Sequence, residues 1–208
     1  MTGLFITIEG IEGVGKTTNV DFVAEFFRAE GAEVIVTREP GGTEMAEKIR
    51  DLILAAPPQG LSDTGELLLM FAARAEHLAS LVRPALERGA TVVCDRFTDA
   101  TFAYQGGGRG LAVEKIALLR DLVQESLRPD LTLLLDAPPE VSAARIAGRD
   151  WKDRFEQERA DFFARVQAAY LAIAEQEPER VQIVDATQPL ETVREAVTLI
   201  LQDLLSNR

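Results

Sequence analysis

Short apolar runs alternate with longer amphipathic stretches along the chain. The apolar runs are rich in leucine and in β-branched residues, a composition typical of strands that are buried on both faces of a parallel sheet. Five runs are expected to be strands: Leu4–Ile8, Val34–Thr37, Thr91–Cys94, Leu131–Leu135 and Val181–Val184. The alternation predicts successive β–α–β units, and therefore an α/β fold of three layers in which helices cover both faces of a five-stranded parallel sheet.

The amphipathic stretches predict helices, and several residues mark where these begin and end. Asp63 followed by Glu66 has the form of a capping box at the start of the third helix. Gly89 suits the end of that helix, and Pro139 suits the first turn of the fifth. The predicted helices are Thr17–Glu30, Thr43–Leu54, Thr64–Arg88, Val113–Ser126, Pro139–Ala147, Phe155–Glu175 and Leu190–Leu205.

Length, charge and cysteine content narrow the classes of protein to consider. A chain of 208 residues suits one domain with a sizeable core, so residues 1–208 are predicted to form a single domain. The formal net charge of -12 repels nucleic acids and anionic membranes, so neither is expected as a partner, and a phosphate site would have to be a local basic island. A single cysteine excludes an intrachain disulfide and suits a reducing, cytoplasmic location.

A glycine-rich motif follows the first predicted strand. Residues 10–17 read GIEGVGKT, which matches the P-loop pattern G-x-x-x-x-G-K-[ST] between a strand and a helix. Glycine lets backbone N–H groups turn toward phosphate oxygens, and the positive end of the helix points to the same place. Lys16 is then expected to reach the β- and γ-phosphates, and the Thr17 hydroxyl to ligate Mg²⁺. The motif indicates triphosphate binding, but it does not separate a kinase from a GTPase or a motor.

Charged residues follow two other predicted strands at the same edge of the sheet. Ligands of open α/β sheets bind outside the carboxyl ends of the strands, where Asp95, Arg96 and the segment 38–43 (REPGGT) lie. Asp95 could hold a Mg²⁺-bound water and Arg96 could bind a second phosphate, although the two could instead form a surface ion pair. Residues 38–43 could instead be an ordinary strand–helix turn. Arg74 lies in an otherwise apolar helical stretch, where a guanidinium either extends to the surface or reaches a partner in a pocket.

Together these segments resemble the thymidylate kinase family of nucleoside monophosphate kinases, which has a P-loop kinase fold. The resemblance rests on residues 10–18, 37–43 (TREPGGT), 95–97 (DRF) with 103–106 (AYQG), 128–131 (RPDL) and 153–156 (DRFE). It extends from Phe5 to about Leu190. It implies transfer of the γ-phosphoryl group of ATP, with Mg²⁺, to dTMP, giving dTDP for dTTP biosynthesis. It also implies a homodimer, for which the apolar helix faces around Leu67–Leu81 could supply an isologous interface.

The resemblance also implies the residues of both substrate sites. The residues expected to bind ATP are Gly10, Glu12, Gly13, Val14, Gly15, Lys16, Thr17, Thr18 and Arg145. The residues expected to bind dTMP are Glu12, Arg38, Pro40, Met70, Phe71, Arg74, Arg96, Thr101, Tyr104 and Gln105. Thr17 and Asp95 are expected at the metal, and Lys16, Arg96, Arg149 and Arg154 are expected to be catalytic.

Individual roles at the dTMP site follow from the same resemblance. Arg38 and Arg96 are expected to hold the acceptor phosphate, and Glu12 is expected to accept a hydrogen bond from the 3′-hydroxyl. Arg74 is expected to donate to a base carbonyl, with Thr101 and Gln105 at the base edge. Tyr104 resembles the family tyrosine that packs under the deoxyribose, where its ring would crowd a 2′-hydroxyl.

The base-stacking position departs from the family pattern. Family members place a phenylalanine four residues before the arginine of this helix, whereas this chain has Met70 there and Phe71 three residues before Arg74. Residues three and four apart share a helix face, so either side chain could reach the base. Phe71 is favoured as the stacking residue, with Met70 beside it.

A basic island at about residues 145–155 is predicted to be a lid that closes over ATP and excludes water; the alternative is a solvated charged turn. Some family members carry a P-loop arginine where this chain has Gly13, so the chain resembles the bacterial subtype that supplies lid arginines instead. Arg149 is expected to neutralise charge on the transferring phosphoryl group, and Arg145 and Arg154 match the same subtype.

Other interpretations remain at this stage. A different nucleotide kinase of the same fold would differ in the residues that meet the acceptor base. A P-loop switch protein would need no acceptor, and a nucleic-acid-stimulated ATPase is disfavoured by the charge. His77 is expected to be structural, Cys94 to be a buried hydrophobe, and the glycine-rich residues 106–110 to form a flexible connection.

Overall fold

The computed structural model describes residues 3–57, 60–147, 155 and 158–207. Its strands are β1 (Phe5–Glu9), β2 (Val34–Arg38), β3 (Thr91–Asp95), β4 (Leu131–Asp136) and β5 (Val181–Asp185). All neighbouring strands are parallel, and their order across the sheet is β2-β3-β1-β4-β5. The expected five-stranded parallel sheet is confirmed, and each predicted strand end lies within one residue of the observed one.

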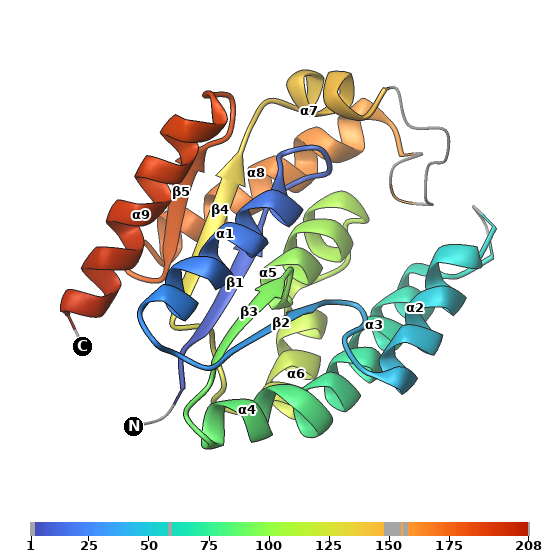
Figure 1. Ribbon diagram of the computed structural model, residues 1–208. Helices are drawn as coiled ribbons and strands as arrows, with labels where there is room; N and C mark the ends of the chain where they lie inside the picture. The colour runs from blue at the N-terminus through green and yellow to red at the C-terminus, as the bar shows by residue number, and fades with distance from the viewer. Residues whose placement is uncertain (1–2, 58–59, 148–154, 156–157, 208) are drawn as a thin grey trace.

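Helices cover both faces of this sheet. The α-helices are α1 (Lys16–Ala29), α2 (Glu44–Ala55), α3 (Asp63–His77), α4 (Arg83–Glu87), α5 (Thr98–Thr101), α6 (Val113–Gln124), α7 (Pro139–Ile146), α8 (Ala160–Gln176) and α9 (Leu190–Ser206). Two π-helical segments span Leu78–Val82 and Phe102–Gly108. Helices α1 and α9 lie on one face, α5, α6 and α8 lie on the other, and α2 packs beside α3 (Figure 1). Within the described residues, none of these helices has the length and apolar character needed to cross a membrane.

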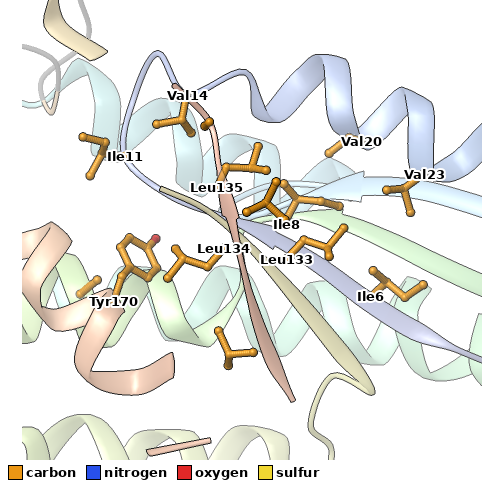
Figure 2. Close-up of a cluster of buried hydrophobic side chains, with 14 of the residues drawn as sticks. Ile6, Ile8, Ile11, Val14, Val20, Val23, Leu133, Leu134, Leu135 and Tyr170 are labelled. Atoms are coloured by element: carbon orange, nitrogen blue, oxygen red, sulfur yellow. The ribbon is translucent and has the colours of Figure 1, made fainter. Parts of the chain in front are cut away.

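The core forms on both sides of the central strands because their apolar side chains alternate. Figure 2 shows Ile8 of β1 beside Leu133 and Leu135 of β4 on the side of α1, whereas Leu134 points to Tyr170 of α8. Each face of the sheet is therefore covered by a helix, which explains why the strands read as continuous apolar runs.

Strand order places a ligand site at the end of β1. The chain passes from β1 to β2 and β3 on one side of the sheet, and then to β4 and β5 on the other. In open α/β sheets a crevice forms at such a reversal, outside the carboxyl ends of the strands. The P-loop leaves β1 at this point.

The third predicted helix, Thr64–Arg88, differs from the observed structure in two details. Residues 63–87 are helical throughout, but a π-helical turn separates α3 from α4. Pro84, in the first turn of α4, lacks the N–H that a regular helix would use there. The N-cap is Ser62, whose hydroxyl accepts from the Gly65 N–H at 3.1 Å, and Asp63 is the first helical residue.

The glycine-rich residues 106–110 are expected from the sequence to form a flexible connection, and this expectation is wrong for residues 106–108. The π-helical segment includes Gly106 and Gly108, which are both buried. A β-carbon on Gly108 would lie 2.5 Å from Cε2 of Phe162, so glycine is needed here for the close approach of α8. Helix α8 itself begins at Ala160, five residues after the predicted start at Phe155.

Candidate functional site

The loop between β1 and α1 has the backbone shape of a phosphate cradle. Gly10 (φ +133°) and Gly13 (φ +81°) adopt conformations that favour glycine, and Gly15 (φ +91°) caps α1. A β-carbon on Gly10 would lie 2.4 Å from the carbonyl oxygen of Leu135, so no side chain fits there. The strand–loop–helix context expected of the motif is present, with Val14 buried in the core below.

Lys16 lies across this loop. Its ammonium donates to the carbonyl oxygens of Gly10 at 3.2 Å and Ile11 at 2.8 Å. Desolvation lowers the pKa of Lys16 to about 8, and the nearby Arg96 charge acts in the same direction. The side chains of Thr17 and Thr18 follow in the first turn of α1 and are exposed. A bound polyphosphate would give this desolvated ammonium a counter-charge.

The end of β3 presents a carboxylate and a guanidinium to the same place. Arg96 has a left-handed backbone (φ +68°), rare for a residue other than glycine, and its N–H donates to the carbonyl oxygen of Ile8 at 3.0 Å. Asp95 Oδ1 is buried and has no hydrogen-bond partner among the described residues. A buried carboxylate oxygen with an unused lone pair suits a metal-bound water, so Asp95 and the Thr17 hydroxyl fit a Mg²⁺ site.

A cavity of about 270 Å³ opens at the carboxyl ends of β1, β2 and β3. Most of the residues expected at the acceptor site line it. They are Glu12, Arg38, Pro40, Met70, Arg74, Arg96, Thr101, Tyr104 and Gln105, together with the expected metal-site residues Thr17 and Asp95. Residues that lie far apart in the sequence therefore meet at one place.

Glu12, Arg96 and Tyr104 form one hydrogen-bonded cluster in this cavity. Arg96 Nη2 donates to Glu12 Oε1 at 2.8 Å and to the Tyr104 hydroxyl at 3.0 Å. The Tyr104 hydroxyl donates to Glu12 at 2.7 and 2.8 Å. Burial raises the pKa of Tyr104, which keeps this hydroxyl a donor. The cluster thus joins the P-loop to the residue after β3 and to the π-helical segment.

Arg38 lies at the opposite, more open wall. Its side chain donates to Glu47 Oε2 at 2.9 Å, and Glu47 Oε1 accepts the Gly42 N–H at 2.8 Å. Arg50 Nη1 donates to the Pro40 carbonyl oxygen at 2.9 Å and also lines the cavity. Helix α2 therefore orders the loop that follows β2.

Arg74 enters the cavity from α3. Its Nε donates to Glu39 Oε2 at 2.7 Å and its Nη2 donates to Thr101 Oγ1 at 3.0 Å. The remaining nitrogen, Nη1, is buried and has no partner among the described residues. Gln105 lines the same region, with its amide nitrogen 2.9 Å from Glu66 Oε1.

Met70, and not Phe71, lies at the cavity. Phe71 packs with Leu67 and with Ile116 of α6 in a separate apolar cluster and does not line the cavity, contrary to the expectation that it stacks on a base. The two side chains are one residue apart on α3, about 100° around the helix, so packing against α6 selects which one faces the ligand space.

The predicted lid lies largely outside the described residues, and Arg149 and Arg154 are among those not described. Arg145, at the end of α7, is described: its Nη2 donates to the carbonyl oxygen of Ala186 at 2.8 Å. This bond joins α7 to the loop after β5, on the other side of the P-loop from the acceptor cavity.

Glu9 was missed by the sequence reasoning. It is fully buried at the end of β1, where Oε1 accepts the Phe97 N–H at 2.7 Å and Oε2 accepts the Tyr170 hydroxyl proton at 2.7 Å. Burial, and then the charge of Asp99, raise the pKa of Glu9 to about 8. The available signal was a carboxylate at the end of a strand that is fully buried and largely apolar. Arg50 and Phe155, which also line the cavity, were missed as well.

The fold and the site define a class of protein. The site combines a P-loop, a neighbouring cavity that is lined by arginines, and a buried carboxylate that suits a metal-bound water. These are the parts of a phosphoryl-transfer enzyme with a second substrate.

Comparison with known proteins names the family. The family model described as thymidylate kinase matches residues 8–197. The thymidylate kinase of Pseudomonas entomophila (strain L48) is 57% identical over 99% of this chain and 98% of its own length. That of Pseudomonas savastanoi pv. phaseolicola is 55% identical over 100% and 99%. The crystal structure of the Ehrlichia chaffeensis thymidylate kinase superposes with a TM-score of 0.79 at 35% identity, covering 97% of this chain and 99% of that one. The chain belongs to the thymidylate kinase family and is an enzyme.

Proposed function

We propose that this chain is a cytoplasmic, single-domain dTMP kinase that transfers the γ-phosphoryl group of ATP to dTMP, giving ADP and dTDP. The observation that carries the proposal is the cavity beside the P-loop. It has guanidinium groups of Arg38 and Arg96 near the metal position and the unpaired Nη1 of Arg74 at its inner wall. Such a cavity suits a ligand with a phosphate at one end and a carbonyl-bearing base at the other.

Arg38 and Arg96 would hold the acceptor phosphate. Both guanidinium groups already contact carboxylates, Glu47 and Glu12, which keep them in place before substrate arrives. The phosphate would be drawn toward the P-loop although ATP itself is anionic, because the arginines offset the repulsion. An oxygen of that phosphate then forms a bond to the γ-phosphorus, while the bond to the bridging oxygen of ADP breaks.

The P-loop would hold the donor. The backbone of residues 10–15 would surround the β-phosphate, and Lys16 would leave the carbonyl oxygens of Gly10 and Ile11 for the β- and γ-phosphates. Mg²⁺, when bound with ATP, supplies charge neutralisation between the phosphates. Thr17 and the water-holding Asp95 are the residues that would position it.

The lid arginines would complete the charge neutralisation. We propose that Arg149 contacts the transferring phosphoryl group and that Arg145 and Arg154 contact ATP. This assignment rests on the sequence motif alone. Arginines in such a role can be worth ~10³-fold or more in rate. We expect Arg149→Ala to lower kcat accordingly, and a kcat within a few-fold of the parent would remove the assignment.

Recognition of thymine would use the inner wall. Arg74 Nη1 would donate to a base carbonyl, Thr101 and Gln105 would meet the base edge, and Met70 would contact the ring face. The Tyr104 ring would lie under the deoxyribose and leave little room for a 2′-hydroxyl. Glu12, which accepts from the Tyr104 hydroxyl, would accept from the 3′-hydroxyl as well.

We also propose a homodimer. Leu68, Ala72 and Ala75 of α3 and Ala79 of the π-helical segment that follows it are exposed at helical spacing. The neighbouring α6 exposes Leu118 (71%) and Leu122 (74%). An apolar face of this kind suits an isologous contact. We expect the parent to have the mass of a dimer in light scattering and Leu118→Glu/Leu122→Glu to have that of a monomer. A monomeric parent would contradict the proposal.

The experiment that tests the acceptor is a coupled assay of ADP production with Mg-ATP. dTMP, dUMP, dCMP and dGMP are compared side by side. We expect strong preference for dTMP. Activity with another acceptor would retain the kinase and reject the thymine site, and ADP production that needs no acceptor would reject both.

A further inference from the structure

The guanidinium of Arg74 has a restricted choice of partners. Only 3% of its side chain is exposed, and two of its three nitrogens are occupied by Glu39 and Thr101. Phe71 and Phe97 flank it, with their ring centroids 4.8 and 5.0 Å from the central carbon. Only Nη1 is left for a ligand among the described contacts. The direction of this one nitrogen therefore determines what Arg74 can read.

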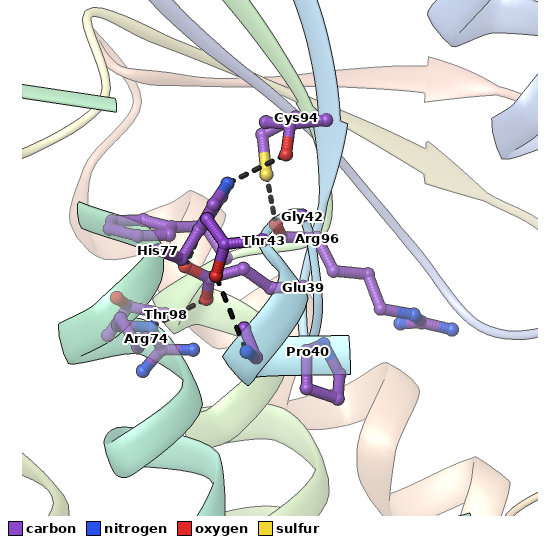
Figure 3. A network of polar contacts seen from close by, with 12 residues as sticks. Glu39, Pro40, Gly42, Thr43, Arg74, His77, Cys94, Arg96 and Thr98 are labelled. Atoms are coloured by element: carbon purple, nitrogen blue, oxygen red, sulfur yellow. Dashed lines mark hydrogen bonds and ion pairs between the residues drawn. The ribbon is translucent and has the colours of Figure 1, made fainter. Parts of the chain in front are cut away.

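Glu39 holds that guanidinium, and His77 holds Glu39. The second carboxylate oxygen of Glu39 lies 2.9 Å from His77 Nδ1 (Figure 3). Nε2 of the same ring lies 2.7 Å from Thr37 Oγ1. A neutral ring with its proton on Nδ1 satisfies every group: Thr37 donates to the ring, the ring donates to Glu39, and Arg74 donates to Glu39. This tautomer is assigned from the hydrogen-bond pattern.

The loop after β2 packs closely against the imidazole of His77. Gly42 adopts a left-handed conformation (φ +87°) against the ring. A β-carbon there would lie 2.7 Å from two ring atoms of His77 and 2.4 Å from Thr37 Oγ1. His77 and Glu39 are 0% and 5% exposed, so water does not compete for these bonds. The contacts from Thr37 to Arg74 are therefore buried and closely packed.

We propose that Glu39 and His77 are positioning residues that determine which acceptor base is used, by aiming Nη1 of Arg74 at a base carbonyl. This inference rests on the proposed dTMP kinase activity. A guanidinium only donates hydrogen bonds, so the aimed nitrogen pairs with the carbonyl oxygen at position 4 of thymine. Cytosine has an amino group at that position, which is also a donor and therefore cannot accept this hydrogen bond. A site that holds the donor in one direction discriminates against cytosine. If the guanidinium were free to rotate, it could turn away from the amino group, and the discrimination would be smaller.

The test compares three substitutions of His77. An asparagine side chain can place its N–H near the position of Nδ1, so His77→Asn keeps the donor to Glu39. His77→Gln places its amide near Nε2 instead, and His77→Leu removes both. The measured quantity is kcat/KM for dTMP divided by kcat/KM for dCMP, with the dissociation constant of an ATP analogue as a check on the P-loop.

We expect the dTMP/dCMP ratio to fall about tenfold or more in His77→Gln and His77→Leu, and to stay within about threefold of the parent in His77→Asn. Glu39→Gln should lower the ratio as well, but it leaves the buried Arg74 without a counter-charge and could prevent folding. The His77 series does not depend on that variant. An unchanged ratio in folded His77→Leu would overturn the inference.

A double-substitution cycle separates this inference from the proposed function. If His77 acts through Arg74, His77→Leu has no further effect on the ratio once Arg74 has been replaced by alanine. An Arg74→Ala variant that keeps the parent's ratio would refute the base-reading role of Arg74 itself. An effect of His77→Leu that persists in the Arg74→Ala background would refute only the positioning role.

Discussion

The π-helical segment Phe102–Gly108 gives a prediction whose sign depends on the structure. If residues 106–108 were a flexible connection, replacing glycine by alanine would stabilise the protein by about 0.4–1 kcal/mol, because the unfolded chain would lose freedom. In the structure, a β-carbon on Gly108 would lie 2.5 and 2.7 Å from two ring atoms of Phe162 and 3.0 Å from Val166. That ring is held by Tyr104 and Phe163, whose centroids are 6.0 and 5.6 Å away, so it cannot withdraw easily.

The magnitude follows from two opposing effects. Overpacking of this kind costs about 1–3 kcal/mol, and the greater helix propensity of alanine returns about 1 kcal/mol. Gly108→Ala should therefore lose up to about 2 kcal/mol of unfolding free energy. Gly106→Ala is the matched control in the same segment, because its β-carbon would lie 3.2 Å from Cδ1, the terminal atom of the Ile116 side chain. Gly106→Ala should be neutral or slightly stabilising.

Urea unfolding followed by circular dichroism measures this difference directly. Thermal unfolding gives a second measurement. If the unfolding free energies of the two variants differ by about 2 kcal/mol, their midpoint temperatures should differ by about 4–8 °C for a protein of this length. The reasoning is refuted if Gly108→Ala is as stable as Gly106→Ala or more stable than the parent.

Three further predictions concern the site. In the folded protein the pKa of Glu9 is raised from 4.5 to about 8. Its favourable contribution to the free energy of unfolding is therefore complete below pH 4.5 and is lost as the pH rises through 8. The stability of Glu9→Gln relative to the parent should therefore increase between pH 5 and pH 8.5 in urea titrations, and parallel pH profiles would contradict this. Tyr104→Phe removes the donor to Glu12 but keeps the ring. Tyr104→Phe should raise KM for dTMP but retain the preference for deoxyribose over ribose monophosphates. Tyr104→Ala should lose that preference. If Tyr104→Phe also lost it, the ring would not be the cause of the preference. Chelation of Mg²⁺ should abolish phosphoryl transfer. Asp95→Asn should raise the Mg²⁺ concentration for half-maximal rate by about 10- to 100-fold. An unchanged Mg²⁺ concentration for half-maximal rate would show that Asp95 does not position the metal.

The strands and the position of the cavity could be predicted from the sequence because both depend on local patterns. Apolar runs bounded by polar residues define β1 to β5, and the parallel sheet brings the residues after β1, β2 and β3 to one edge. Glu12, Asp95 and Arg96 therefore meet at the cavity without any knowledge of helix packing.

The features that were not predicted depend on contacts between distant elements. Met70 rather than Phe71 faces the cavity because α6 places Ile116 against Phe71. Glycine at position 108 suggested flexibility, whereas the approach of α8 makes it a packing requirement. His77 is expected from the sequence to be structural, but the sequence does not show that it contacts the carboxylate that holds Arg74.

The central claim, that this chain moves the γ-phosphoryl group of ATP onto dTMP, is tested most directly with ATP labelled in that group. The labelled products are separated after incubation with Mg²⁺, with and without dTMP. We predict that the label appears in dTDP in equal amount to the ADP formed, with little ADP in the absence of dTMP. Label found mainly as inorganic phosphate, at a rate independent of dTMP, would contradict the account.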